Sequence, residues 1–192
     1  MQQQVLWIAL LAGLAGGAGC RAADTAGAES PEQSTGEQPD EELPPMPYTA
    51  EQIRIACQPG TELHFRISGA RGAPLTQVMR FTGDDGTRAT LETWMEAHGK
   101  PTGPPETQHA EWAELQSHAS FPAGTVRERD TITVEAGTFD AWRYHSEFTD
   151  HRGSGHRTMW FADRTPGPPV LMSEYVGDVE VQRMELVARA KP

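Results

Sequence analysis

Apolar and polar residues alternate with a period of two over much of the chain beyond residue 60, and this pattern is typical of β-strands with one buried face. Leu63–Ile67 shows it most plainly. Val78–Phe81 and Ala89–Met95 repeat it on either side of Asp84-Asp85-Gly86, a sequence that favours a hairpin turn. Consecutive strands joined by short turns predict an antiparallel sheet.

The second half of the chain continues the pattern. Phe139–Phe148 pairs with Thr131–Val134 in a predicted hairpin around Glu135-Ala136-Gly137, and Trp142, Tyr144 and Phe148 then share one face. Three more strands are expected at Thr158–Ala162, Val170–Val176 and Val179–Ala188. Pro166-Gly167-Pro168-Pro169 separates the first of these from the last two, which pair around Gly177-Asp178.

Two segments predict helices. Thr49-Ala50-Glu51-Gln52 matches a capping box, and the short helix after it would carry Ile53, Ile55 and a packed Cys57 thiol before Pro59-Gly60 ends it. His109–Phe121 predicts a longer helix that Pro122 helps to end. Its apolar face would consist of Trp112, Leu115 and Ala119.

These elements predict an α+β domain over residues 49–192. With so few helices, a sheet of about seven or eight strands must curve to bury its apolar face. We therefore expect a curved antiparallel β-sheet, an open half-barrel, with one packed helix and a short N-terminal helix.

The N-terminus predicts export. The apolar run Val5–Leu14 is about half the length of a transmembrane helix, so residues 1–19 are interpreted as a signal peptide. The small residues Ala18 and Gly19 before Cys20 resemble the bacterial lipoprotein signal. That resemblance implies cleavage before Cys20, a diacylglycerol on its thiol and acylation, for example with palmitate, of the new amino group. Such an anchor would hold the protein on a membrane.

A second interpretation of the N-terminus stays open. Ordinary cleavage nearby would leave a soluble exported protein in which Cys20 and Cys57 could form a disulfide. If Cys20 is lipidated, the sorting rule of enteric bacteria implies the outer membrane rather than the inner one, because Arg21 and not Asp follows the cysteine. Whether the domain faces the periplasm or the outside is left open.

Residues 20–48 combine the modified cysteine with a disordered, acidic, proline-rich tether. Seven acids and Arg21 give residues 21–50 a charge of −6, out of −11 for the whole chain. The acidity therefore describes the tether more than the domain. The negative net charge also argues against nucleic acid as a partner, since phosphate recognition needs a basic face.

Four segments carry a family resemblance. They are Ala136–Trp142, Trp160-Phe161-Ala162, Pro166–Val170 and Met184–Val187, and they resemble uncharacterised bacterial exported lipoproteins of the TapB-like kind. The resemblance implies a β-rich envelope domain, distantly similar to the open barrels of LolA and LolB. It supplies no catalytic residues to carry over.

The residues predict neither a metal site, nor a cofactor, nor a catalytic centre. His145, His151 and His156 lack the short, fixed spacing of zinc ligands. Gly153-Ser154-Gly155-His156 is not a nucleophile elbow, because it lies in a predicted loop and lacks the Gly-x-Ser-x-Gly spacing. We therefore expect a non-enzymatic protein, with an exported hydrolase of unidentified catalytic residues as the alternative.

The tryptophan residues of the predicted domain are the remaining candidates for a functional site. Such large rings usually fill a core. The functional alternative is a pocket between the sheet and the central helix, lined by Trp112, Leu115, Trp142 and Tyr144. The sequence thus predicts a membrane-anchored envelope lipoprotein that binds an apolar small molecule or an envelope protein.

Overall fold

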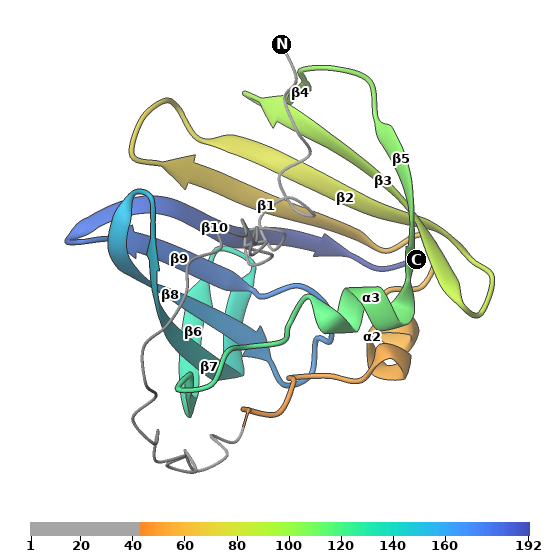
Figure 1. Ribbon diagram of the computed structural model, residues 1–192. Coiled ribbons are helices and arrows are strands. Elements are labelled where there is room, and N and C mark those ends of the chain that lie inside the picture. Colours follow the sequence, from red (N-terminus) through yellow and green to blue (C-terminus); the bar gives the residue numbers. More distant parts are fainter. Residues whose placement is uncertain (1–42) are drawn as a thin grey trace, which may run out of the picture. The chain divides into compact units, whose positions relative to one another are not determined.

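The computed structural model describes residues 43–192. The predicted signal peptide, Cys20 and most of the predicted tether lie outside these residues. The described elements are α2 (Ala50–Ala56), β1 (Glu62–Gly69), β2 (Leu75–Asp84), β3 (Arg88–Ala97), β4 (Lys100–Pro101), β5 (Glu106–Glu111), α3 (Trp112–Ser117), β6 (Val126–Val134), β7 (Gly137–Asp150), β8 (Gly153–Ala162), β9 (Leu171–Val176) and β10 (Val179–Ala190) (Figure 1).

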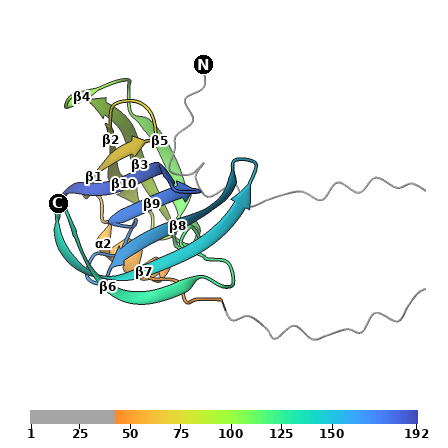
Figure 2. The same cartoon turned by 90° about the vertical axis from the view of Figure 1, so that its left-hand side faces the viewer.

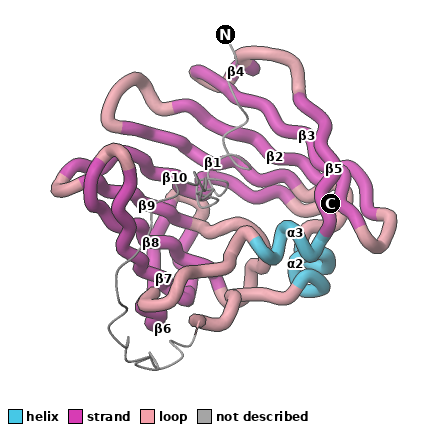
Figure 3. Tube along the Cα trace, viewed as in Figure 1, coloured by secondary structure: helices cyan, strands magenta, loops and turns pink. Residues whose placement is uncertain are grey.

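All the strands of the described part belong to one antiparallel sheet, in the order β4-β3-β2-β1-β10-β9-β8-β7-β6, with β5 also paired to β3. The predicted open, antiparallel α+β architecture is confirmed. The sheet has ten strands and not seven or eight. The eight predicted strands are present, and the two additional ones are the short strands β4 and β5, seen together with the helices in Figure 3.

The segment before Trp112 corrects the helix prediction. Glu106–Glu111 is strand β5, which pairs with Arg88–Thr93 of β3, so the predicted helix His109–Phe121 is reduced to Trp112–Ser117. Ala110 lies opposite Ala89, and both are buried. The unpaired edge of β3 offers this segment backbone hydrogen bonds, and tertiary pairing overrides its helical periodicity.

Helix α2 begins as predicted. Thr49 Oγ1 accepts a hydrogen bond from the Gln52 backbone N–H, and Gln52 Oε1 accepts one from the Thr49 backbone N–H at 2.8 Å. Ile53 and Cys57 are buried, but Ile55 is 59% exposed, so it does not share their packing. Residues two apart on a helix point in different directions, whereas residues four apart lie on one face.

The helices lie on the concave side of the sheet. Figure 2 shows the sheet bending around the side on which α2 lies. Trp112 of α3 stacks on Phe81 of β2, with 6.0 Å between ring centroids. Tyr48, which precedes α2, meets Phe161 of β8 edge to face. Neither described helix is long and apolar enough to cross a membrane.

Candidate functional site

A row of apolar side chains crosses six strands on the concave side of the sheet. Directly paired residues of antiparallel strands point to the same side. The register therefore places six side chains from β7, β8, β9, β10, β1 and β2 in one line: Tyr144, Met159, Met172, Met184, Ile67 and Leu75. We call this line the methionine row.

Methionine is concentrated on this side of the sheet. Met79 and Met95 also lie on it, so every methionine of the described strands faces the concave side. Met159, Met172 and Met184 are buried, Ile67 is half-buried and Leu75 is 37% exposed. The row thus runs from the interior of the domain to a solvent-accessible end at β2.

Helix α3 contacts strand β2 at a point far from the methionine row. Trp112 contacts Phe81, six residues along β2 from Leu75, which corresponds to ~20 Å of strand. Trp112 is 4% exposed and Leu115 is 8% exposed. Both side chains are therefore buried, and the pocket expected between this helix and the sheet stays a prediction.

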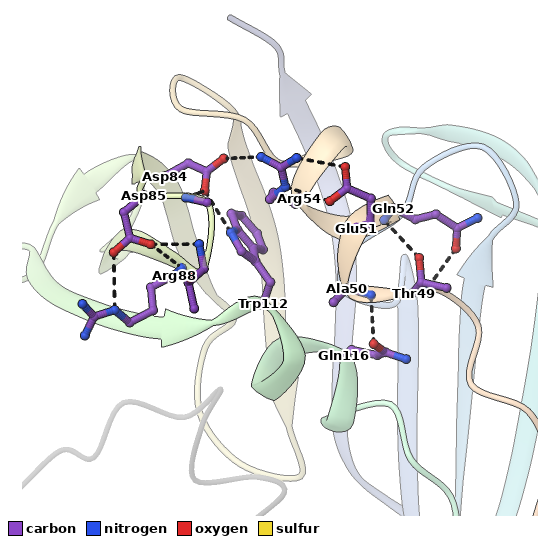
Figure 4. A network of polar contacts seen from close by, with 12 residues as sticks. Thr49, Ala50, Glu51, Gln52, Arg54, Asp84, Asp85, Arg88, Trp112 and Gln116 are labelled. Carbon is purple, nitrogen blue, oxygen red and sulfur yellow. Dashed lines mark hydrogen bonds and ion pairs between the residues drawn. The ribbon is translucent and has the colours of Figure 1, made fainter.

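Asp84 joins α3 to α2 and to the β2–β3 turn (Figure 4). Its Oδ1 accepts hydrogen bonds from the backbone N–H of Gly86 at 2.8 Å and from Trp112 Nε1 at 3.0 Å, and its Oδ2 accepts one from Arg54. The Gly86 N–H, followed by Trp112, holds the pKa of Asp84 below its usual range. This arrangement fixes the position of Trp112 and is structural.

Tyr144 lies beneath the segment that follows α3. Its ring stacks on Phe121 with 4.2 Å between centroids, and its hydroxyl donates to the Pro45 carbonyl oxygen at 2.7 Å. Burial raises the pKa of Tyr144, so the phenol stays neutral and acts as a donor. The Tyr48 hydroxyl likewise donates to the Ala162 carbonyl oxygen. Pro45 and Tyr48, which the sequence assigns to the tether, thus contact the folded domain.

Trp142 lies beside two arginines of β6. The guanidinium carbons of Arg127 and Arg129 lie 3.4 and 3.8 Å from its ring centroid. Arg129 also forms an ion pair with Asp163. Of the predicted pocket residues, Trp142 and Tyr144 are thus neighbours on β7, both with Arg127 beside them, while the ring contact of Trp112 is with Phe81 on β2.

The two arginines were missed by the sequence reasoning, although a signal for them exists. The predicted hairpin places Trp142 directly opposite Arg129, and Tyr144 opposite Arg127. Extending that register by four residues before Thr131, the first residue of the predicted strand, would have found both arginines, because paired residues share a face.

A charged cluster lies beside the methionine row. Glu174 of β9 is opposite Arg157 of β8 and is 2% exposed. Glu174 Oε2 accepts from Arg157 Nε at 2.9 Å, while its Oε1 is 2.8 Å from Arg152 Nη2. Arg152 also pairs with Asp150. The carboxylate is therefore compensated on both oxygens, as a buried charge requires.

Of the three histidines considered as metal ligands, His145 and His156 lie on the convex side of the sheet and His151 lies in the β7–β8 turn. His145 and His156 have their ring centroids 5.2 Å apart, and His156 stacks on Tyr175 at 4.8 Å. Within residues 43–192, no group of three His, Cys, Asp or Glu side chains is arranged to hold a metal ion. The Ser154 hydroxyl shares a hydrogen bond with Thr149 at 3.0 Å.

Two open hollows flank the end of β7. The larger, about 570 Å³, is lined by Glu147, Phe148, Thr149, Ser154, Gly155, His156, Gly177 and Asp178. The smaller, about 240 Å³, lies against the segment before β6 and is lined by Pro122, Ala123, Gly124, Thr125, Val126, His145, Ser146 and Glu147. Their linings mix polar and apolar groups, in contrast to the methionine row.

No protein-family model matches the chain, and no curated protein matches it significantly. Solved structures that it resembles include a candidate exported protein with YmcC-like fold from Bacteroides fragilis, at 12% identity and a TM-score of 0.47, covering 70% of this chain and 97% of that one. A candidate lipoprotein from Parabacteroides distasonis has 10% identity and a TM-score of 0.43, covering 70% and 96%. At these values the likeness carries no functional argument. Neither structure is described as TapB-like or LolA-like, so that resemblance stays a prediction.

Proposed function

We propose that the domain is a non-enzymatic binding module that takes an apolar chain along its methionine row. The observation that carries the proposal is the continuity of the row over six strands, from buried Tyr144 to the 37% exposed Leu75. Six strands at their normal spacing span ~24 Å, enough for a long acyl chain to lie across them.

The side-chain chemistry of the row favours an adaptable apolar site. Methionine is unbranched and polarisable, so it can change rotamer to admit a ligand at lower energy than a β-branched residue. Met159, Met172 and Met184 occupy three adjacent strands. An apolar chain inserted there would replace apolar contacts among these side chains by apolar contacts with the ligand. Most small-molecule sites likewise have a mainly apolar lining.

The test uses the full chain carrying Cys20→Ala, which removes the predicted lipidation site, and N-phenyl-1-naphthylamine, a neutral dye that fluoresces in apolar surroundings. We expect saturable binding of the dye and its displacement by palmitate. Met184→Gln, which places an amide in the row, should weaken dye binding about tenfold. The matched control Val179→Gln, at a 57% exposed position of the same strand, should leave it unchanged. A chain that binds no dye while folded contradicts the proposal.

We also propose that Cys20 carries the lipid that attaches this module to a bacterial envelope membrane, with the outer membrane as the destination. The sequence around Cys20 and Arg21 supports this. Metabolic labelling with radioactive palmitate should mark the wild-type chain but not Cys20→Ala, and only the wild type should sediment with membranes. Recovery of exported Cys20→Ala in the membrane fraction would overturn the anchor.

A further inference from the structure

Arg127 lies at the β6 end of the methionine row. It is opposite Tyr144 in the β6–β7 register, so its side chain leaves the sheet on the same side as the row. Its guanidinium carbon is 3.4 Å from the Trp142 ring centroid and 5.7 Å from that of Tyr144. The apolar row therefore ends beside a cation.

The ion pairing of Arg127 differs from that of its neighbours. Arg129 pairs with Asp163, Arg143 with Glu128, and Arg157 with Glu174. Within residues 43–192, Arg127 has no carboxylate partner; its guanidinium interacts with the Tyr144 hydroxyl, and its buried Nε makes no hydrogen bond. A half-buried cation without a counter-charge is unfavourable, because desolvation is not compensated. An anion bound there would supply the missing charge.

The stacking of Arg127 suits this role. A guanidinium that lies over an aromatic ring keeps its in-plane N–H groups free to donate, and two of them match the two oxygens of a carboxylate or phosphate. The ring also restricts the guanidinium before a ligand arrives, which lowers the entropy that binding must remove.

From these contacts we infer that the ligand of the concave face is an amphiphile, with an oxyanion head group bound by Arg127 and an apolar chain along the methionine row. This inference rests on the proposed function and adds the chemical class of the ligand. Carboxylate and phosphate head groups share the recognition chemistry, and a fatty acid and an alkyl phosphate represent the two sources.

The test compares three competitors of equal chain length against the neutral dye bound to the full-length Cys20→Ala chain: palmitate, hexadecyl phosphate and hexadecanol. A charge-assisted hydrogen bond is worth enough for a preference of about tenfold or more. We therefore expect at least one anion to displace the dye about ten times better than the alcohol. The preference should shrink as salt rises, since ions screen an accessible charge.

Arg127→Gln should bring the anions and the alcohol to within about threefold of each other in displacing the dye. The matched control is Arg143→Gln, on β7 between Trp142 and Tyr144 but on the opposite side of the sheet, which should retain the full preference. If Arg127→Gln does not fold, the salt dependence of the wild-type preference decides.

The outcomes separate the two proposals. Absence of dye binding overturns the proposed function and this inference together. Dye binding with equal competition by alcohol and anions overturns the inference alone, as does a preference that survives Arg127→Gln or does not change with salt. A preference for hexadecyl phosphate over palmitate supports the inference and identifies phosphate as the head group.

Discussion

Arg157 and Glu174 face each other across β8 and β9, and the carboxylate that Arg157 contacts is 2% exposed. Replacing a buried carboxylate by an amide leaves the arginine charge uncompensated. We expect Glu174→Gln to lower the free energy of unfolding by about 3–5 kcal/mol in urea titrations. Glu128→Gln, at a half-exposed ion pair with Arg143, is the control and should change it by under about 1 kcal/mol. Equal effects would show that the buried pair does not stabilise the fold.

Gly155 is the position on β8 that leaves least room for a side chain. A Cβ there would lie 2.0 Å from the Tyr175 carbonyl oxygen and 2.8 Å from Phe148 Cζ, so the backbone of β9 must move to admit it. Gly155→Ala should therefore destabilise the domain by about 1–3 kcal/mol. Gly103→Ala is the control, because a Cβ there meets no atom within 4 Å, and it should leave the stability unchanged. Thermal melts of both variants measure the difference. A stable Gly155→Ala variant would contradict this packing.

Cys57 links the stability of the domain to alkaline pH. Burial raises the pKa of its thiol to about 11, from ~8.5 in an unfolded chain. The thiol is therefore neutral in both states below pH ~8.5, and above it the unfolded chain loses the proton first. We expect the free energy of unfolding to fall with pH by up to about 1.4 kcal/mol per unit between pH 8.5 and 10.

The control for this pH dependence is Cys57→Ala, which should show a shallower slope over the same range. Above pH 10 both proteins should also lose stability, because burial raises the pKa of Tyr48 and Tyr144. Identical slopes for the two proteins would contradict the linkage. Native Cys57 should also resist thiol reagents until the chain unfolds, since its side chain is fully buried and its Sγ lies 3.6 Å from the Pro166 carbonyl oxygen.

The capping box of α2 can be measured separately. Thr49→Ala removes the acceptor for the Gln52 N–H, and the loss of such a cap lowers stability by about 1 kcal/mol. Thr87→Ala replaces an exposed threonine of the β2–β3 turn and should have little effect. Chemical denaturation of both variants checks the prediction, and equal stabilities would contradict it.

The strands could be predicted because their side chains obey a local rule. Alternation places Leu63 and Phe65 on the buried side whatever their partners are, and Asp84-Asp85-Gly86 specifies a turn from three residues. The prediction of a helix over 109–121 was wrong for the opposite reason. Its first three residues pair with β3, and the free edge of β3 is a tertiary feature that no local pattern contains.

The candidate site could be predicted only in part. Trp142 and Tyr144 were found because aromatic residues stand out in a strand. The methionine row depends on which strands are neighbours, and β10 lies between β1 and β9, which are more than a hundred residues apart. Met184 therefore meets Met172 and Ile67 through a pairing order that alternation within each strand does not encode.

The central place of β10 has a consequence for how the chain folds. Strand β10, Val179–Ala190, pairs with β1 on one side and with β9 on the other. Without β10 in place, each half of the sheet keeps an unsatisfied edge, and unpaired edges promote aggregation. For the same reason, truncation before Val179 would separate two half-sheets rather than shorten one.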